Sequence, residues 1–347
     1  MSMPKITLAV PTNWQDDLIP YLSDSNIGDV YGKISGDFIG SATLLQNRDI
    51  QISKDSVIKY IRNVHSQGVR FTYLMDTTCL DNLEWTRQGQ KQIRRLLDSL
   101  VLFGVDAVAI SMPYLVELIK KQYPGLGVEI SPAAEIDNVQ RARRWEDLGA
   151  DLITLASYKI NRNFKLLREI RSHVKCGLQL VANHFCLNNC VNHTFHANVI
   201  SHITQQAQND AENMDAYCNL GCREQQIKEK FEIISSQWIR PEDTGYYEEI
   251  GINKLQLLGS NMDKNGIIKV IQAYSRRSYS GNLAELFPGK NTLKPDIFIN
   301  NCVLDKFINY FLEERCLGLC AECGYCKDTA NKAVQTERIE DTLSSWY

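Results

Sequence analysis

The sequence predicts a (β/α)8 barrel of the TIM type, and three features of the chain support this fold class. Eight short apolar runs alternate with longer amphipathic ones, as parallel strands joined by helices do. Gly68, Gly104 and Gly149 are each followed within about three residues by an apolar run, which is typical of a glycine that ends a helix. The chain has no glycine-rich dinucleotide turn, and this disfavours the alternative fold, an open doubly wound sheet.

The order of these runs gives the expected elements. The eight strands are expected at residues 6–11, 29–34, 70–76, 107–111, 128–131, 152–156, 177–182 and 254–259. Helices are expected at residues 14–23, 54–67, 89–103, 114–122, 139–148 and 163–173, and after the last strand at 266–274.

One insertion and one tail depart from the barrel pattern. Residues 184–237 form a cysteine- and histidine-rich insertion between strands 7 and 8. It leaves from the C-terminal end of a strand, where barrel enzymes build their active sites, and long insertions of this kind are usually functional. We therefore expect a barrel over residues 1–280, with the main metal site on the insertion, and a cysteine-rich C-terminal tail over residues 281–347 with a second metal site.

Composition narrows the classes of partner and compartment. The net charge of −3 and the pI near 6.1 give no overall attraction to nucleic acid or anionic membranes, so DNA is not an expected partner and RNA is disfavoured without being excluded. No apolar run approaches the ~20 residues of a membrane helix, and the first residues lack a secretory signal. We therefore expect a cytoplasmic protein, in which the 11 cysteines stay reduced and serve as metal ligands or reactive thiols.

The insertion contains two Cys-x3-Cys pairs separated by 27 residues: Cys186 with Cys190, and Cys218 with Cys222. Soft thiolates in a reduced compartment bind an iron–sulfur cluster or zinc. The alternative is that these are packed structural cysteines, but isolated packing residues have no reason to recur at regular spacing.

Two histidines of the insertion are candidate proton-transfer groups. If residues 186–196 are helical, spacings of four, three and three residues place His193 and His196 on the same face as Cys186 and Cys190. Histidine is the side chain that most often transfers protons near neutral pH, so both are candidate catalytic residues. His202 falls off this face and is expected to be an ordinary polar residue.

A second group of cysteines lies in the tail. Four thiols fall within eleven residues, at Cys316, Cys320, Cys323 and Cys326, which predicts a second site for zinc or an iron–sulfur cluster. The Cys-x3-Cys-x2-Cys spacing also occurs in radical S-adenosylmethionine enzymes, where it follows an early barrel strand. Here it lies in the last tenth of the chain, and this position argues against a radical enzyme. Cys79 and Cys176 stand alone and are expected to be packed.

Polar residues at two places on the barrel rim are candidate binding groups. Arg240 and Glu242 precede the eighth strand; they either hold an anionic substrate group beside the cluster or pair with each other to fix the loop. Tyr31 and Lys33 at the second strand, and Asp76 at the third, lie where barrel strands present substrate-binding residues.

The chain resembles peptidase family U32, the collagenase-like peptidases of unassigned catalytic type. The resemblance rests on residues 29–33, 104–108 and 123–131, and most specifically on Cys218-x3-Cys222-Arg223 and on Trp238-Ile-Arg-Pro-Glu-Asp243. It covers residues 6–260, most of the chain.

The resemblance implies a TIM-like barrel and, from members that hydroxylate ubiquinone precursors or RNA without oxygen, a 4Fe–4S cluster. The cluster would map onto the cysteines at positions 186, 190, 218 and 222, although here the first pair is tighter and followed by histidines. It also implies a paired protein subunit. No His-Glu-x-x-His or Gly-x-Ser-x-Gly motif suggests a peptidase. We therefore expect an iron–sulfur enzyme that modifies a small-molecule, peptide or RNA substrate by a redox or hydroxylation reaction. A peptidase is the second expectation, and a non-catalytic iron–sulfur partner subunit is the third.

Overall fold

The protein is a TIM-like (β/α)8 barrel, as the sequence predicts. The computed structural model describes residues 5–23, 26–35, 37–43, 52–205, 221–259, 262–288 and 297–336. Eight parallel strands close in sequence order, because the last pairs with the first. They are β1 (Thr7–Pro11), β2 (Ile27–Gly32), β3 (Arg70–Met75), β4 (Ala107–Ile110), β5 (Gly127–Ile130), β6 (Leu152–Thr154), β7 (Gly177–Val181) and β8 (Lys254–Gln256).

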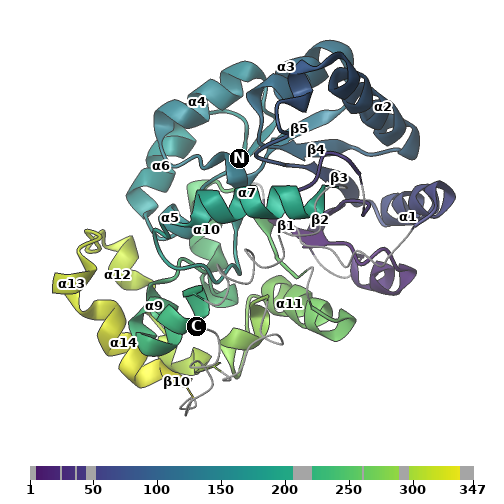
Figure 1. Ribbon diagram of the computed structural model, residues 1–347. Coiled ribbons are helices and arrows are strands. Elements are labelled where there is room, and N and C mark those ends of the chain that lie inside the picture. The colour runs from purple at the N-terminus through teal and green to yellow at the C-terminus, as the bar shows by residue number, and fades with distance from the viewer. Residues whose placement is uncertain are drawn as a thin grey trace, which may run out of the picture.

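Helices surround the barrel, and Figure 1 shows α1, α2, α3, α4 and α6 in sequence around the strands. They are α1 (Lys54–Ser66), α2 (Arg87–Phe103), α3 (Pro113–Gln122), α4 (Val139–Leu148), α5 (Ser157–Ile160) and α6 (Phe164–His173), followed later by α10 (Thr244–Ile250) and α11 (Lys264–Arg276). Local signals set their ends. Thr86 caps the start of α2, and Gly104 ends it at a φ of 83°, a conformation that glycine adopts without strain.

One expected helix is wrong in type. Residues 14–23 do not form an α-helix; they contain the short 3-10 helix η1 (Asp16–Tyr21). Pro20 lies inside it and has no backbone N–H to donate to the preceding turn, so a regular α-helix cannot run through this position.

The apolar core lies between the barrel and its helices, whereas the lumen of the barrel is largely polar. Lys254 from β8 donates to Asp29 on β2 (Nζ–Oδ2 2.7 Å) and to Glu129 on β5 (Nζ–Oε1 2.9 Å), and all three residues are buried. Three non-adjacent strands are therefore joined by one buried ion network across the lumen.

The insertion after β7 contains α7 (His193–Thr204), a helical stretch over the described residues 221–228, and α9 (Lys230–Ser235). Residues 206–220, and Cys218 with them, lie outside the described residues. The expected helix over 186–196 is wrong for its first half, because the chain is irregular until His193. Asn189 takes a positive φ of 53°, a left-handed conformation that interrupts a right-handed helix.

Helix α7 lies over the C-terminal ends of the strands, the side on which barrels carry out chemistry. It is bonded to the loops that follow β2 and β3: the Ser41 amide donates to Thr204 Oγ1 (2.7 Å), and the Thr78 amide donates to Ser201 Oγ (3.0 Å). In Figure 1 this helix crosses the middle of the view in front of the strands. It therefore covers the mouth of the barrel.

The C-terminal segment packs on the side of the barrel near α9. It contains η5 (Leu283–Leu286), β9 (Ile297–Ile299), η6 (Asn301–Leu304), α12 (Asn309–Leu312), α13 (Cys320–Cys323), α14 (Tyr325–Ala333) and β10 (Val334–Thr336), with β10 antiparallel to β9. Its apolar residues, among them Phe287 and Phe307, join the same core cluster as the barrel. In the described part of the chain, no helix has the length and hydropathy needed to cross a membrane.

Candidate active site at the barrel mouth

A cavity of about 170 Å³ opens beneath α7 at the C-terminal ends of the strands. Its walls come from the loops after β2, β5, β6 and β7, from β8 and from α7. The polar and aromatic lining residues are Thr43, Ser157, Tyr158, His184, Cys186, His193, His196 and Gln256. Cys186, His193 and His196, which the sequence singles out, therefore meet in one cavity.

Glu135, His193 and Cys186 form a chain of polar contacts beside this cavity. His193 Nδ1 lies 3.1 Å from Glu135 Oε1, and the His193 ring stacks on Tyr158 with centroids 3.6 Å apart and planes 9° apart. The Cys186 thiol lies against the same imidazole. The carboxylate and the stacked phenol ring together fix the orientation of the histidine.

The protonation of this chain follows from its contacts. Burial raises the pKa of the Cys186 thiol, but His184 and His193 together outweigh burial and lower the pKa to about 5. Burial lowers the pKa of His193, while Cys186 and Glu135 raise it, with a net result of about 9. The hydrogen bond with His193 holds the pKa of Glu135 well below its usual range. Without a metal, the pair is a thiolate and an imidazolium at neutral pH.

Two further cysteines of the predicted metal set lie beside this chain. A hydrogen bond with the Cys222 thiol lowers the pKa of Cys190 to about 6, and Cys186 is close enough to oppose that shift. Three of the four predicted ligands, from segments more than thirty residues apart in sequence, therefore gather at the mouth. The fourth, Cys218, lies outside the described residues.

His184 lies in the cavity wall beside the Cys186 thiol, whose pKa it helps to lower. The residue is 5% exposed and lines the cavity, and neither Nδ1 nor Nε2 makes a hydrogen bond of ordinary geometry. Buried polar atoms normally have partners, so this side chain fits a site that binds a ligand or metal.

Sequence reasoning missed Glu135, Tyr158 and His184 as site residues. A signal was available for each, because they follow the fifth, sixth and seventh strands within a few residues, on the rim where barrels place functional groups.

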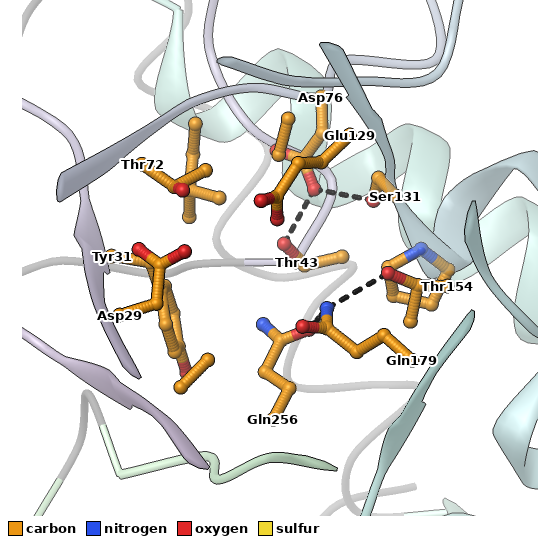
Figure 2. A pocket seen from close by; sticks show the side chains of 14 residues that line it. Asp29, Tyr31, Thr43, Thr72, Asp76, Glu129, Ser131, Thr154, Gln179 and Gln256 are labelled. Carbon is orange, nitrogen blue, oxygen red and sulfur yellow. Dashed lines mark hydrogen bonds between the residues drawn. The ribbon is translucent and has the colours of Figure 1, made fainter. Parts of the chain in front are cut away.

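The lumen below the mouth contains two of the three expected substrate-binding residues. Asp76 accepts hydrogen bonds from Ser41 Oγ (2.5 Å), Thr43 Oγ1 (2.5 Å) and Ser131 Oγ (2.8 Å), the last two of which Figure 2 shows. The hydroxyl of Tyr31 donates to a backbone carbonyl (2.9 Å). Both side chains line the lumen cavity, but their polar atoms already bond within the protein.

The third expected substrate-binding residue, Lys33, lies outside both cavities. It is 2% exposed and forms an ion pair with Asp37, which also accepts a hydrogen bond from Tyr73 (2.6 Å). These contacts fix the loop after β2.

Arg240 and Glu242 contact the C-terminal segment and do not line the mouth cavity. Arg240 donates from Nε to Asn301 Oδ1 (2.9 Å) and from Nη1 to the carbonyl of Leu304 (2.5 Å). Glu242 accepts from the Tyr279 amide (2.7 Å) and lies 3.4 Å from Arg240. The expected position across from His193 and His196 is not found; the contacts match the alternative, in which the pair fixes the loop.

The four tail cysteines, at positions 316, 320, 323 and 326, line one separate cavity beside α9. Of the two lone cysteines, Cys176 is half-buried near Glu146, and burial raises its pKa to about 12. Cys79 lies with Asp81 and His202, and within the described ranges this is the one trio of potential metal ligands whose ligand atoms all lie within 4.8 Å.

Comparison with known proteins identifies relatives of the chain. The model of peptidase family U32 matches residues 45–224. The "uncharacterized protease MJ1657" of Methanocaldococcus jannaschii is 34% identical over 283 residues, which are 82% of this chain and 82% of that protein. The solved structure of the U32 peptidase Mk0906 matches with a TM-score of 0.54 and 23% identity, over 75% of this chain and 95% of that one, a likeness of fold.

Proposed function

This chain belongs to peptidase family U32, and from that premise we propose that it is an iron–sulfur enzyme that modifies an organic, peptide or RNA substrate by a redox reaction at the barrel mouth. One observation carries the proposal: Cys186, Cys190 and Cys222 gather beside a cavity that also holds an oriented histidine.

The residues at the mouth fit a thiolate-bound cluster. Soft thiolates are the ligands that iron–sulfur clusters use, and Cys218, four residues before Cys222, is the expected fourth donor. The three described thiols are not all within 4.8 Å of one another, whereas the ligands of a single zinc ion lie about 4 Å apart or closer. His184, which lies against the Cys186 thiol and whose nitrogens make no hydrogen bond of ordinary geometry, adds a further donor at the cavity wall.

The residues of the chain supply the proton chemistry and the positioning. A bound cluster supplies single-electron transfer. His193 faces the cavity and can transfer a proton to or from the substrate, while Glu135 holds it in one orientation and stabilises its charged form. Helix α7 covers the cavity and limits the access of water to the reacting atoms.

The test is metal analysis of full-length protein purified without oxygen. Cys186→Ser and Cys222→Ser should each lose about one cluster, measured as iron, acid-labile sulfide and visible absorbance. Cys176→Ser is the matched control, because that thiol is half-buried and does not line the mouth cavity. This variant should keep its full iron, sulfide and visible absorbance. Full iron content in both mouth variants would contradict the proposal.

A cysteine peptidase is the second candidate, and the Cys186–His193–Glu135 chain favours it. In this reaction the Cys186 thiolate attacks a peptide carbonyl, and the imidazolium of His193 gives its proton to the leaving amine. Water then attacks the thioester, returns a proton to His193 and releases the acid. A thiolate that binds a metal cannot act in this way, so the two candidates exclude each other.

One experiment separates the two candidates. Metal-free reduced protein is assayed for cleavage of denatured collagen and casein in the presence of a chelator. Cleavage that disappears in Cys186→Ser but persists in Cys222→Ser supports the peptidase. Absence of cleavage, together with iron at the mouth, supports the redox enzyme.

A further inference from the structure

We infer that the tail cavity holds an iron–sulfur cluster in preference to a zinc ion, with Arg162 as its buried counter-cation. This centre is separate from the barrel mouth and does not depend on the function proposed there. The sequence alone leaves zinc and iron–sulfur equally open at the four tail cysteines; the arrangement of the site distinguishes them.

The first argument is size. The cavity lined by Cys316, Cys320, Cys323 and Cys326 has a volume of about 360 Å³, which is far more than one ion occupies. With zinc–sulfur bonds of ~2.3 Å, tetrahedral coordination would bring all four thiols within about 4 Å of one another. In the described part of the chain only the Cys79 trio gathers its ligand atoms within 4.8 Å, so no three of the tail thiols do. The spacing fits an occupant of several atoms.

The second argument is charge. Arg162 is 4% exposed, and its guanidinium donates to the carbonyls of Ile234 (2.6 Å) and Trp238 (3.0 Å). No carboxylate lies within 4.0 Å of it among the described ion pairs. A guanidinium stays charged, and a buried charge without a close counter-charge is costly. Among the ionisable groups around Arg162, Cys326 interacts with it most strongly, followed by Tyr247, Asp243 and Cys316. Asp243 therefore offsets part of this charge, and a cluster held by four thiolates supplies further negative charge.

The third argument is the aromatic wall. Tyr310 and Tyr325 stack with centroids 4.0 Å apart, and the Tyr310 hydroxyl lies 3.1 Å from Cys323 Sγ. The Arg162 guanidinium lies 4.3 Å from the Trp238 ring centroid and 4.9 Å from that of Phe307. Low polarity and hydrogen bonds to the sulfurs are the means by which a protein sets the potential of a cluster.

The position of the site suits electron transfer. Cys316, Cys320 and Cys323 are exposed, and Leu317 and Leu319 between them are 78% and 55% exposed. A cluster here would lie at the surface, where an external one-electron donor can reduce it.

The test uses full-length protein purified without oxygen, with dithionite as the reductant. Cys320→Ser and Cys323→Ser should lose about one cluster of iron and sulfide, while the iron that depends on Cys186 and Cys222 remains. Cys302→Ser is the control, because this exposed thiol does not line the cavity. Zinc in place of iron, or unchanged metal in both tail variants, would overturn the inference.

Arg162 is tested by its effect on the reduction potential. A nearby positive charge favours the reduced cluster, so Arg162→Gln should lower the midpoint potential of the tail cluster. Arg162→Lys keeps the positive charge, so its midpoint potential should stay close to that of the wild type. The signal that Cys320→Ser removes identifies the tail cluster. Equal potentials in wild type and both Arg162 variants would show that Arg162 is not its counter-cation.

Discussion

At the scale of single residues, Asp243 shows how burial makes stability depend on pH. Burial raises the pKa of its carboxyl group to about 6, although Arg240 and Arg162 oppose the shift. The native state therefore binds a proton that the unfolded chain releases, and stability falls as the pH rises from about 4 to about 6. We expect Asp243→Asn to remove this dependence and to raise stability at pH 8, by an amount on the order of 2 kcal/mol. Urea unfolding of both proteins at pH 4.5, in the lower part of the step, and at pH 8, about two units above it, checks this prediction. The same pH dependence in both proteins would contradict it.

The Cys186–His193 pair gives a second prediction at the same scale. In metal-free protein the thiolate persists until the pH falls through about 5, and the imidazolium persists until the pH rises through about 9. Alkylation of Cys186 by iodoacetamide should therefore reach half its maximal rate near pH 5. Removing the cation in His193→Gln should move that midpoint upward by at least one pH unit, roughly what loss of a close opposite charge produces.

The control for this pair is His196→Gln, which changes another histidine of the same cavity. The groups that lower the pKa of Cys186 are His184 and His193, so in His196→Gln the midpoint should stay near the wild-type value. A shift of equal size in both variants would show that cavity polarity, and not the His193 contact, controls the thiol.

At the scale of elements, the docking of α7 depends on a glycine in the loop after β2. Gly40 has a φ of 70°, and a Cβ there would lie 2.6 Å from the carbonyl oxygen of Ser201 on α7. In Gly40→Ala the new Cβ would clash with this backbone oxygen, which cannot move without the helix. The substitution should therefore strain the loop and displace α7. Hydrogen exchange should increase selectively in α7, and Cys186 should become easier to alkylate.

Gly68→Ala is the matched control for the α7 prediction. Gly68 has a similar φ of 72°, but a Cβ there meets nothing within 4 Å. It should have only the backbone penalty, about 1 kcal/mol. If exchange in α7 is the same in both variants, contact with Gly40 does not hold the helix over the mouth.

At the scale of the whole molecule, the buried ion network joins three strands that are not neighbours in the barrel. Lys254→Met leaves Asp29 and Glu129 buried without their cation, which should destabilise the protein by about 3–5 kcal/mol. Lys59→Met, which removes an exposed ion pair with Asp16, should cost less than about 1 kcal/mol. Equal urea midpoints for the two variants would show that the network does not stabilise the closed barrel.

Most of the fold could be predicted from the sequence, because its signals are local. Apolar runs, capping residues and helix-ending glycines such as Gly104 act within a few residues, and all eight strands and most helices follow from them. The predicted helix at residues 14–23 is wrong in type because Pro20 interrupts it, and the predicted helix at 186–196 is wrong in its first half, where Asn189 has a positive φ.

The sequence by itself determined the barrel, the rim that carries the site and the cysteines that gather there. Only the tertiary structure decided which partners they meet. Glu135 reaches His193 across 58 positions of the chain, and Arg240 is bonded to Asn301, 61 positions away. Residue spacing defines the face of a helix or strand, but it does not specify which side chains from distant segments meet when the barrel closes. The proton-transfer pair, the polar lumen and the buried cation beside the tail cysteines follow from that closure.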